Sequence, residues 1–144
     1  MSIRTIIVQE KSAIEFEADA NAAITPGQIV ELLSTGKVQK NASAAVDGER
    51  MIAIEDTLQG NDIADDYDAG DRVLMRIMGR GDVVHAILAD GQDAPIGTKL
   101  ELATGGELNA YSAGVKMFVA LTDVDASDSA TTTVANRRIK VRVI

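Results

Sequence analysis

Apolar and polar residues alternate with a period of two in two segments of the chain, residues 72–78 and residues 138–144. Successive side chains of a β-strand point to opposite faces, so this alternation is typical of a strand with one buried face. The side chains that it places toward a core are Val73, Met75, Ile77, Ile139, Val141 and Val143. Residues 3–8 form a further short run rich in β-branched side chains, which favour strands.

Glycine-containing turns separate such runs at short intervals. Gly36 and Gly106 each lie between two alternating segments, which indicates a β-hairpin. Further turns are expected around Gly79 and Gly91. Short strands at intervals of roughly 8–12 residues are typical of an all-β sandwich or barrel. The sequence therefore predicts one compact domain of residues 1–144, a β-barrel or β-sandwich of short antiparallel strands with little helix.

Two segments of the chain, residues 24–42 and residues 94–112, resemble each other. The aligned residues are Gly27 with Gly97, Gly36 with Gly106, Glu31 with Glu101, Val30 with Leu100, Leu32 with Leu102, and Val38 with Leu108. The shared features are turn glycines and inward apolar positions, which a common fold requires. A site used twice would instead keep its polar groups. We therefore interpret the pair as a repeated hairpin scaffold, with the two glutamates as a candidate contact surface.

The same order of resemblance continues outside these segments. The further matching pairs are residues 16–19 with 87–90, residues 52–56 with 119–123, and residues 72–78 with 138–144. Two generic hairpins can match by chance, but a preserved order favours duplication of one β-unit. We predict two units, residues 3–71 and residues 72–137, followed by a closing strand, residues 138–144.

The composition of the 144-residue chain excludes several kinds of site. The chain has no cysteine, which excludes disulfides, thiolate metal sites and a cysteine nucleophile. Its formal net charge of −8 repels phosphate backbones, and aromatic residues make up only 3%, so we expect no nucleic-acid partner. The longest apolar run, residues 117–121, is too short to span a bilayer, and no membrane partner is predicted. Residues 1–10 lack the apolar core of a signal peptide, so we expect synthesis in the cytoplasm.

The titratable residues do not show the spacing of a catalytic site. His85, the only histidine, lies within an apolar run, and no G-x-S-x-G motif supplies a serine partner. Glu15 and Glu17 share one strand face, where neighbouring carboxylates are normally solvated. We therefore expect a protein without enzymatic activity, with no catalytic residue, no metal site and no cofactor.

One stretch, residues 55–71, carries seven carboxylates and no basic residue. Its spacing does not match the alternate ligands of an EF-hand. The stretch is a solvated loop, a cation site of another kind, or a surface that faces a basic patch on a partner. The candidate residues of an oligomer or partner surface are Asp65, Asp66, Asp68, Glu31 and Glu101.

This set of motifs resembles tailed-phage head decoration proteins, also called capsid cement proteins. The resemblance rests on residues 25–32 (TPGQIVEL), residues 36–38 (GKV) and the apolar residues 52–54 (IAI). A later match is residues 70–73 (GDRV), where a Gly-Asp turn leads into a strand. The motifs are turn glycines and alternating apolar residues, and they extend over most of residues 24–144.

The resemblance implies a structural role. Such proteins bind the outer surface of an expanded icosahedral capsid, contact the major capsid protein and stabilise the head against the pressure of packaged DNA. The resemblance also implies self-association, as a homotrimer or alternatively a dimer, and a place on the virion after synthesis in the host cytoplasm. A small carbohydrate- or ligand-binding β-module of a phage structural protein is the alternative function.

The N-terminal residues have two interpretations. Members of this family often reach the capsid with an N-terminal arm, which the resemblance places at residues 1–8. The capsid-contact candidates, which would add a strand to a capsid sheet edge, are Ile3, Arg4, Thr5, Ile6 and Ile7. The alternative is an ordinary first strand of the protein's own sheet, since both interpretations use the same unpaired backbone groups.

Overall fold

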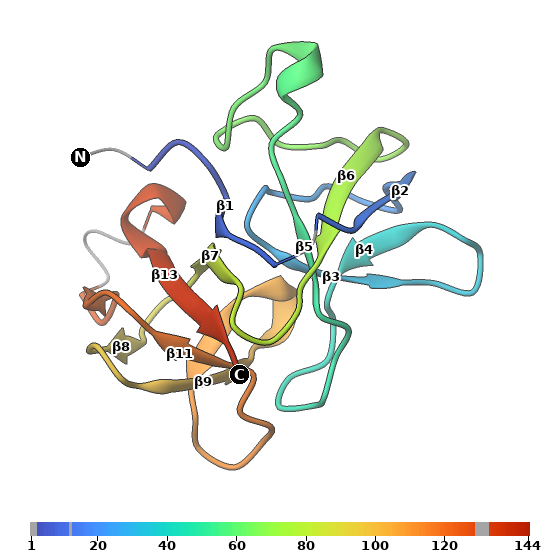
Figure 1. The fold of residues 1–144 in the computed structure, drawn as a ribbon. Helices are drawn as coiled ribbons and strands as arrows, with labels where there is room; N and C mark the ends of the chain where they lie inside the picture. Colours follow the sequence, from blue (N-terminus) through green and yellow to red (C-terminus); the bar gives the residue numbers. More distant parts are fainter. Residues whose placement is uncertain (1–2, 12, 129–132) are drawn as a thin grey trace.

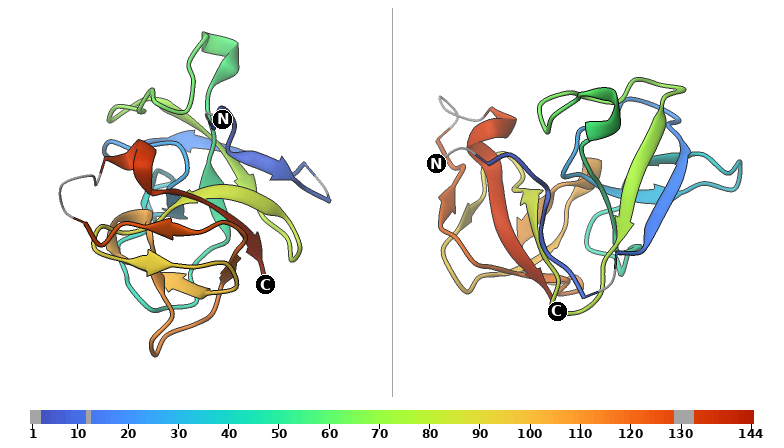
Figure 2. Two further views of the ribbon diagram at one scale, coloured as in Figure 1. Left: turned by 90° about the vertical axis from the view of Figure 1, so that its left-hand side faces the viewer. Right: turned by 45° about the horizontal axis from the view of Figure 1, so that its top comes forward.

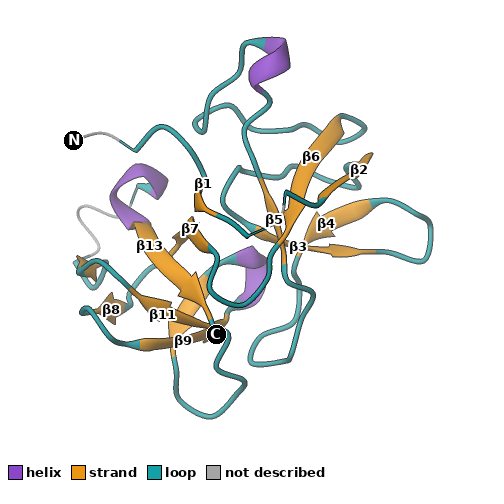
Figure 3. Ribbon diagram, viewed as in Figure 1, coloured by secondary structure: helices purple, strands orange, loops and turns teal. Residues whose placement is uncertain are grey.

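The structure is a computed structural model that describes residues 3–11, 13–128 and 133–144. Its regular elements are strands and three short 3-10 helices (Figures 1 and 3). The strands are β1 (Ile7–Gln9), β2 (Glu15–Asp19), β3 (Ile29–Leu32), β4 (Val38–Lys40), β5 (Met51–Ala53), β6 (Arg72–Ile77), β7 (Val83–Ile87), β8 (Asp93–Ala94), β9 (Lys99–Leu102), β10 (Leu108–Ala110), β11 (Phe118–Ala120), β12 (Val124–Asp125) and β13 (Arg138–Val143). The 3-10 helices are η1 (Thr57–Gln59), η2 (Thr104–Gly106) and η4 (Val134–Arg137).

Two antiparallel sheets pack against each other as a compact sandwich (Figure 2). The N-terminal sheet has the strand order β2-β6-β5-β3-β4. The C-terminal sheet has the order β1-β7-β13-β11-β9-β10, and a small ladder joins β8 to β12. The predicted all-β class is confirmed, and of its two forms the structure is the sandwich.

The two sheets have the same internal strand order. Apart from β1, each strand of one sheet has a counterpart at the same place in the other: β2 with β7, β6 with β13, β5 with β11, β3 with β9, and β4 with β10. An isolated parallel bridge joins Ala20 to Val38, and its counterpart joins Leu88 to Leu108. Each bridge joins the residue after the first strand of the unit, β2 or β7, to the first residue of the unit's third strand in that sheet, β4 or β10, so the resemblance extends beyond the strand pairs.

The hydrogen bonds between turns and strands repeat as well. The N–H of Gly27 donates to the carbonyl oxygen of Ala53 at 2.8 Å, and that of Gly97 donates to Ala120 at 2.9 Å. We propose that the sheets come from a duplicated β-unit. Because β6 pairs with β2 and β5, the strand arrangement favours an N-terminal unit of residues 15–77 and a C-terminal unit of residues 83–143.

The strand register corrects one alignment inferred from the sequence. Phe16 lies opposite Met75 in the N-terminal sheet, and Val84 lies opposite Val141 in the C-terminal sheet. Since β6 and β13 are counterparts, Phe16 corresponds to Val84 and not to Ile87. The alignment of residues 16–19 with 87–90 was therefore wrong by an odd number of residues, which would turn every side chain to the opposite face.

Most side chains predicted to face inward are buried. Confirmed core residues are Val30, Val38, Val73, Met75, Leu100, Leu102, Leu108, Ile139, Val141 and Val143. Two predictions are wrong, because Leu32 is 44% exposed and Ile77 is 39% exposed. Both lie at the ends of their strands, β3 and β6, where the alternation continues but no part of the described chain covers them.

The C-terminal unit packs on the N-terminal unit through a turn that requires glycine. A Cβ on Gly106 would lie 2.5 Å from the carbonyl oxygen of Ile29, and the φ of Gly106 is +73°. Its N–H donates to the carbonyl oxygen of Asn41 at 2.9 Å. The counterpart of Gly106 is Gly36, which has a similar φ of +84° and nothing within 4 Å of an added Cβ.

Arg138 fastens the two units together. Its side chain is buried, and its Nη1 and Nη2 atoms donate to the carbonyl oxygens of Pro26 and Ile63, each at 2.8 Å. Burial lowers the pKa of this guanidinium, while the charges of Asp66 and Glu55 act to raise it. A buried charge is tolerated when hydrogen bonds replace its lost water. Arg138 therefore ties β13 to a turn and to the acidic stretch of the N-terminal unit.

The two glycines at the hairpin turns allow a matched stability test. Gly106→Ala should lower the free energy of unfolding by about 2–5 kcal/mol, since it adds a clash with Ile29 to the cost of a left-handed backbone. Gly36→Ala should cost only about 1–2 kcal/mol, because it has the backbone cost without the clash. Urea denaturation of both variants measures the difference, and equal losses would contradict the close approach of Gly106.

Arg138 allows a second test. Arg138→Met should lower the free energy of unfolding by about 2–4 kcal/mol, because the carbonyl oxygens of Pro26 and Ile63 lose their donors in a buried place. Arg142→Met is the control, since Arg142 lies exposed on the same strand and its loss should change stability by less than about 0.5 kcal/mol. Chemical denaturation compares the two, and a neutral Arg138→Met would show that Arg138 does not fasten the units.

Candidate partner-binding cleft

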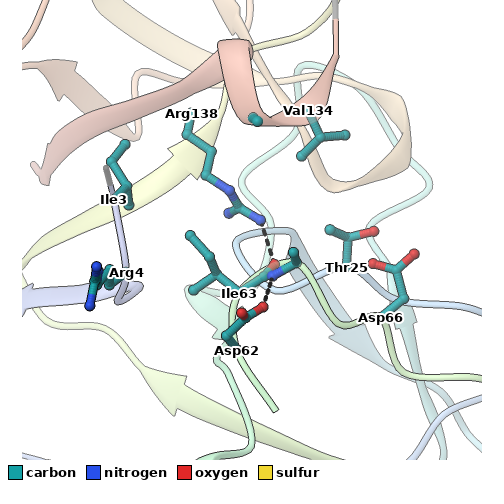
Figure 4. A pocket seen from close by; sticks show the side chains of 10 residues that line it. Ile3, Arg4, Thr25, Asp62, Ile63, Asp66, Val134 and Arg138 are labelled. Carbon is teal, nitrogen blue, oxygen red and sulfur yellow. Dashed lines mark hydrogen bonds between the residues drawn. The ribbon is translucent and has the colours of Figure 1, made fainter. Parts of the chain in front are cut away.

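A cleft of about 880 Å³ opens beside Arg138 (Figure 4). Residues from four segments line it: Ile3 and Arg4 of the N-terminal residues, Thr25 of the turn before β3, Asp62, Ile63 and Asp66 of the acidic stretch, and Val134 and Arg138 from η4 and the start of β13. Ile3 and Arg4 lie on the opposite side of the cleft from Asp66 and Thr25 in the close view. The cleft thus brings together residues predicted separately as capsid contacts and as a partner surface.

Three of the segments that line the cleft, namely the N-terminal residues, the acidic stretch and η4, lie outside the repeated strands. In the N-terminal unit, Ile24 pairs with Tyr67, and the counterpart of this pair is Ala94 with Val124. The acidic stretch before Tyr67 is much longer than the link before Val124, and η4 follows Val124 where the N-terminal unit has a short turn. The proposed duplication therefore predicts one such cleft in the described part of each chain.

The N-terminal residues are held on the protein's own C-terminal sheet. Ile7 pairs with Val84, and Ile6 is fully buried. The N–H of His85 donates to the carbonyl oxygen of Ile6 at 2.8 Å, and the N–H of Ile6 donates to Oε2 of Glu55 at 3.2 Å. Residues 7–9 are therefore a strand of this chain, which is the alternative to a free arm.

This pairing narrows the predicted capsid contacts. The side chain of Ile6 is buried, which disfavours a contact through it, whereas Ile7 lies in β1, an edge strand that pairs with β7 on one side only, so contact at Ile7 stays a prediction. Arg4 and Thr5 are exposed and Ile3 is half-buried, so these three stay candidates. The first two residues of the proposed arm lie outside the described residues.

His85 contacts the backbone of the N-terminal residues and not a serine hydroxyl. Its Nδ1 atom lies 2.8 Å from the carbonyl oxygen of Thr5. Burial lowers the pKa of His85, the bond to Thr5 acts to raise it, and the charges of Lys140 and Arg138 lower it further. This environment favours the neutral imidazole, with a proton on Nδ1 that donates to Thr5.

The carboxylates of the acidic stretch accept hydrogen bonds from its own turns. Asp65 Oδ2 accepts from the N–H of Asp62 at 2.8 Å, and Asp62 Oδ1 accepts from Ala64 at 2.8 Å. The N–H of Asp68, an exposed residue, donates to Asp71 at 2.8 Å. In the part of the chain that the structure describes, no three Asp, Glu, His or Cys side chains are grouped to hold a metal ion.

Tyr67 anchors the acidic stretch to the body of the protein. The side chain is buried, and its hydroxyl donates to the carbonyl oxygen of Ile54 at 2.6 Å. Burial raises the pKa of Tyr67 to about 12, so the hydroxyl keeps its proton at neutral pH. The η1 turn beyond this anchor projects from the body (Figure 1) and carries Leu58, which is 89% exposed. Leu58 is a surface residue that the sequence pattern did not reveal.

The aligned pair of glutamates has two different roles. Glu101 is buried, and its carboxylate accepts from Ser112 Oγ at 3.2 Å and from the N–H of Gly114 at 2.7 Å. The prediction of Glu101 as a contact residue therefore needs correcting, because its carboxylate organises a loop. Glu31 is half-buried and accepts from Gln39 Nε2 at 2.7 Å, so it stays a candidate.

The cleft combines apolar walls with few polar groups, which is the usual form of a binding site. Ile3, Ile63 and Val134 supply apolar surface, and Arg4 and Asp66 supply opposite charges. Sequence reasoning missed Val134, because no motif distinguishes η4. No helix in the described part of the chain is long and apolar enough to cross a membrane.

Comparison with known proteins identifies a similar fold. No protein-family model matches the chain, and no curated protein matches it. The crystal structure of the N base of head fiber gp8.5 in bacteriophage phi29 is similar, with a TM-score of 0.62 and 12% sequence identity. The match covers 92% of this chain and 95% of that chain. At this identity the likeness shows the fold, so the sandwich of this chain is one that a phage head protein also has.

Proposed function

We propose that the protein is a non-enzymatic structural protein of a tailed-phage head, which binds the outer capsid surface as a decoration or cement protein. The observation that carries this proposal is the similarity to the phi29 head fiber base over nearly the whole of both chains. The resemblance of residues 25–32 and 36–38 to decoration proteins supports the same class from the sequence. Both comparisons concern proteins of phage heads, although one rests on fold and the other on motifs.

The major capsid protein is the proposed partner, and a homotrimer is the proposed form on the virion. Many identical copies on a capsid lattice gain avidity from geometry, so each contact can be modest. The net charge of −8 keeps the free protein soluble and favours basic patches on the capsid. No cofactor and no nucleic acid is part of this proposal.

The cleft and the projecting η1 turn are the proposed capsid-facing surface. Arg4 and Asp66 place a positive and a negative charge at the cleft, and such a pair can orient a bound partner. Leu58 on the η1 turn adds an exposed apolar side chain. Exposed apolar residues beside charged groups are the usual elements of an interface. The alternative of a carbohydrate module is disfavoured at this cleft, because its described lining contains no aromatic side chain for a sugar to stack on.

Co-sedimentation with expanded capsids from the same source tests this proposal. Wild-type protein should bind, and Arg4→Glu should weaken binding at least about 10-fold, since it reverses a charge at the contact. Arg142→Glu is the matched control, because it makes the same charge change on an exposed residue at the far end of β13 and should bind like wild type.

The two possible failures are distinguishable. Wild-type protein that does not sediment with capsids would contradict the proposed function. If wild-type protein binds capsids and Arg4→Glu binds equally well, the cleft is not the capsid contact, but the proposed function still holds. Point variants are preferable to deletion of residues 1–8, because the deletion also removes Ile6 from the core.

A further inference from the structure

The two units of the chain contact each other through different faces. The projecting face belongs to the C-terminal unit and consists of Leu102, Gly106 and Arg138. The receiving face belongs to the N-terminal unit and consists of Pro26, Ile29, Asn41 and the segment 45–48. The bonds that join them run from Gly106 N–H to the Asn41 carbonyl at 2.9 Å, from Ala45 N–H to the Leu102 carbonyl at 2.8 Å, and from Arg138 Nη1 to the Pro26 carbonyl at 2.8 Å.

Each face has a counterpart on the other unit. By strand position, Leu32, Gly36 and Arg72 of the N-terminal unit correspond to the projecting face. Ile96, Lys99 and Tyr111 of the C-terminal unit correspond to Pro26, Ile29 and Asn41. One shared bond supports the second equivalence: Asn41 N–H donates to the Ile29 carbonyl, and Tyr111 N–H donates to the Lys99 carbonyl, both at 2.8 Å.

Both counterpart faces carry exposed apolar side chains, and the second is covered in part, because an added Cβ on Gly114 would lie 2.6 Å from Ala45 of the same chain. On the first, Leu32 is 44% exposed, whereas its counterpart Leu102 is buried. Elsewhere in the N-terminal unit, Ile77 is 39% exposed, whereas its counterpart Val143 is buried. On the second, Ile96 is 64% exposed and Tyr111 is 39% exposed, whereas Pro26 and Asn41 are buried. The large apolar residues exposed in the described chain are Val8, Ile14, Leu32, Val46, Leu58, Ile77, Ile96 and Tyr111. Four of these eight residues, Leu32, Ile77, Ile96 and Tyr111, therefore occupy positions whose counterparts in the other unit are buried.

We propose that the chain self-associates head to tail, with the projecting-face counterpart of one copy packed on the receiving-face counterpart of the next. This contact repeats between chains the interface that already exists within each chain. A second copy is the expected occupant, because the molecule carries one unpaired version of each half of that interface. Contacts between unlike faces form a closed ring when the rotation between copies closes, and an open chain otherwise.

The equivalence specifies individual contacts between copies. Arg72 of one copy donates to the carbonyl oxygen of Ile96 of the next, as Arg138 does to Pro26. The side chain of Arg72 is 60% exposed, and its nearest carboxylate contact, with Asp19, is 3.3 Å long, so a surface ion pair holds it only weakly. The turn at Gly36 approaches Tyr111 of the next copy, as Gly106 approaches Asn41 within the chain. Space for this approach exists, since an added Cβ at Gly36 would meet nothing within 4 Å.

The absence of cysteine allows a direct crosslinking test. Within the chain, an added Cβ on Gly48 lies 2.5 Å from Leu102 Cδ1. Leu32 is the counterpart of Leu102, and Val115 is the counterpart of Gly48, since each stands at the same distance before its strand, β11 or β5. The double variant Leu32→Cys with Val115→Cys should therefore form disulfide-linked multimers under mild oxidation, which reductant removes.

The matched control is Leu58→Cys with Val115→Cys. Leu58 is more exposed than Leu32 but lies outside both faces, so this pair should give little crosslinked product. Equal crosslinking of the two pairs would overturn the proposal. A single Leu32→Cys variant that forms a complete dimer would also overturn it, because that outcome requires like faces to meet.

Light scattering of the uncrosslinked protein supplies a second readout. Wild-type protein should show an average mass above that of one chain, and Leu32→Asp or Ile96→Asp should weaken self-association at least about 10-fold. Leu58→Asp should leave the mass unchanged. A wild type that stays monomeric at all concentrations would overturn the proposal. These experiments give the self-association proposed above a surface and use no capsids, so their failure is distinct from a failure of capsid binding.

Discussion

The arrangement of the molecule depends on one buried hydrogen-bonded charge, the guanidinium of Arg138. A guanidinium is tolerated in an interior only when acceptors replace its water, and here two main-chain carbonyl oxygens of the N-terminal unit do so. Gly27 suits this point, because its φ of +98° is one that other residues rarely adopt and an added Cβ would lie 3.2 Å from the carbonyl oxygen of His85 and 2.6 Å from Arg138 Nη1. One side chain thereby fixes the positions of the turn at Pro26 and of the acidic stretch at Ile63 relative to the start of β13. These elements border the cleft, so the interaction that joins the units also shapes the candidate site.

The two sheets have the same internal strand order, but the two units have different surroundings. The interface between the units covers one face of each unit, and the two faces are not equivalent. Leu102 is therefore buried while Leu32 is exposed, and Gly106 packs on a backbone while Gly36 meets solvent. A residue with the same type and strand position thus has a different role in each unit. The difference lies in what packs on it and not in its own sequence.

Sequence periodicity reports which face of a strand is apolar, and for that reason it identified Val73, Met75, Ile139 and Val141 as core residues. It does not report whether another element covers a strand end, which is why Ile77 was wrongly placed inside. The first strand was left open between two interpretations, because pairing with the chain's own sheet and pairing with a partner use the same backbone groups. The units proposed from the strand pairing differ from the predicted residues 3–71 and 72–137, because β6 pairs within the N-terminal sheet, and its sequence does not indicate which sheet it joins. The cleft could not be predicted from the sequence, because its lining comes from four segments far apart in the chain.

The division between repeated and unrepeated segments also separates two kinds of contact. The repeated strands and turns carry the faces proposed for self-association, because a duplicated unit supplies each half of an interface twice. Most of the segments that line the cleft have no counterpart in the other unit, so the cleft is suited to a partner that binds one site on each copy. The similar fold at 12% identity fits this division, since a fold can be retained through core and turn positions while surface loops change. Partner choice is then expected to reside in residues such as Arg4, Leu58 and Asp66, and assembly in residues such as Leu32 and Ile96. Because the two sets do not overlap, variants can weaken one contact and leave the other intact.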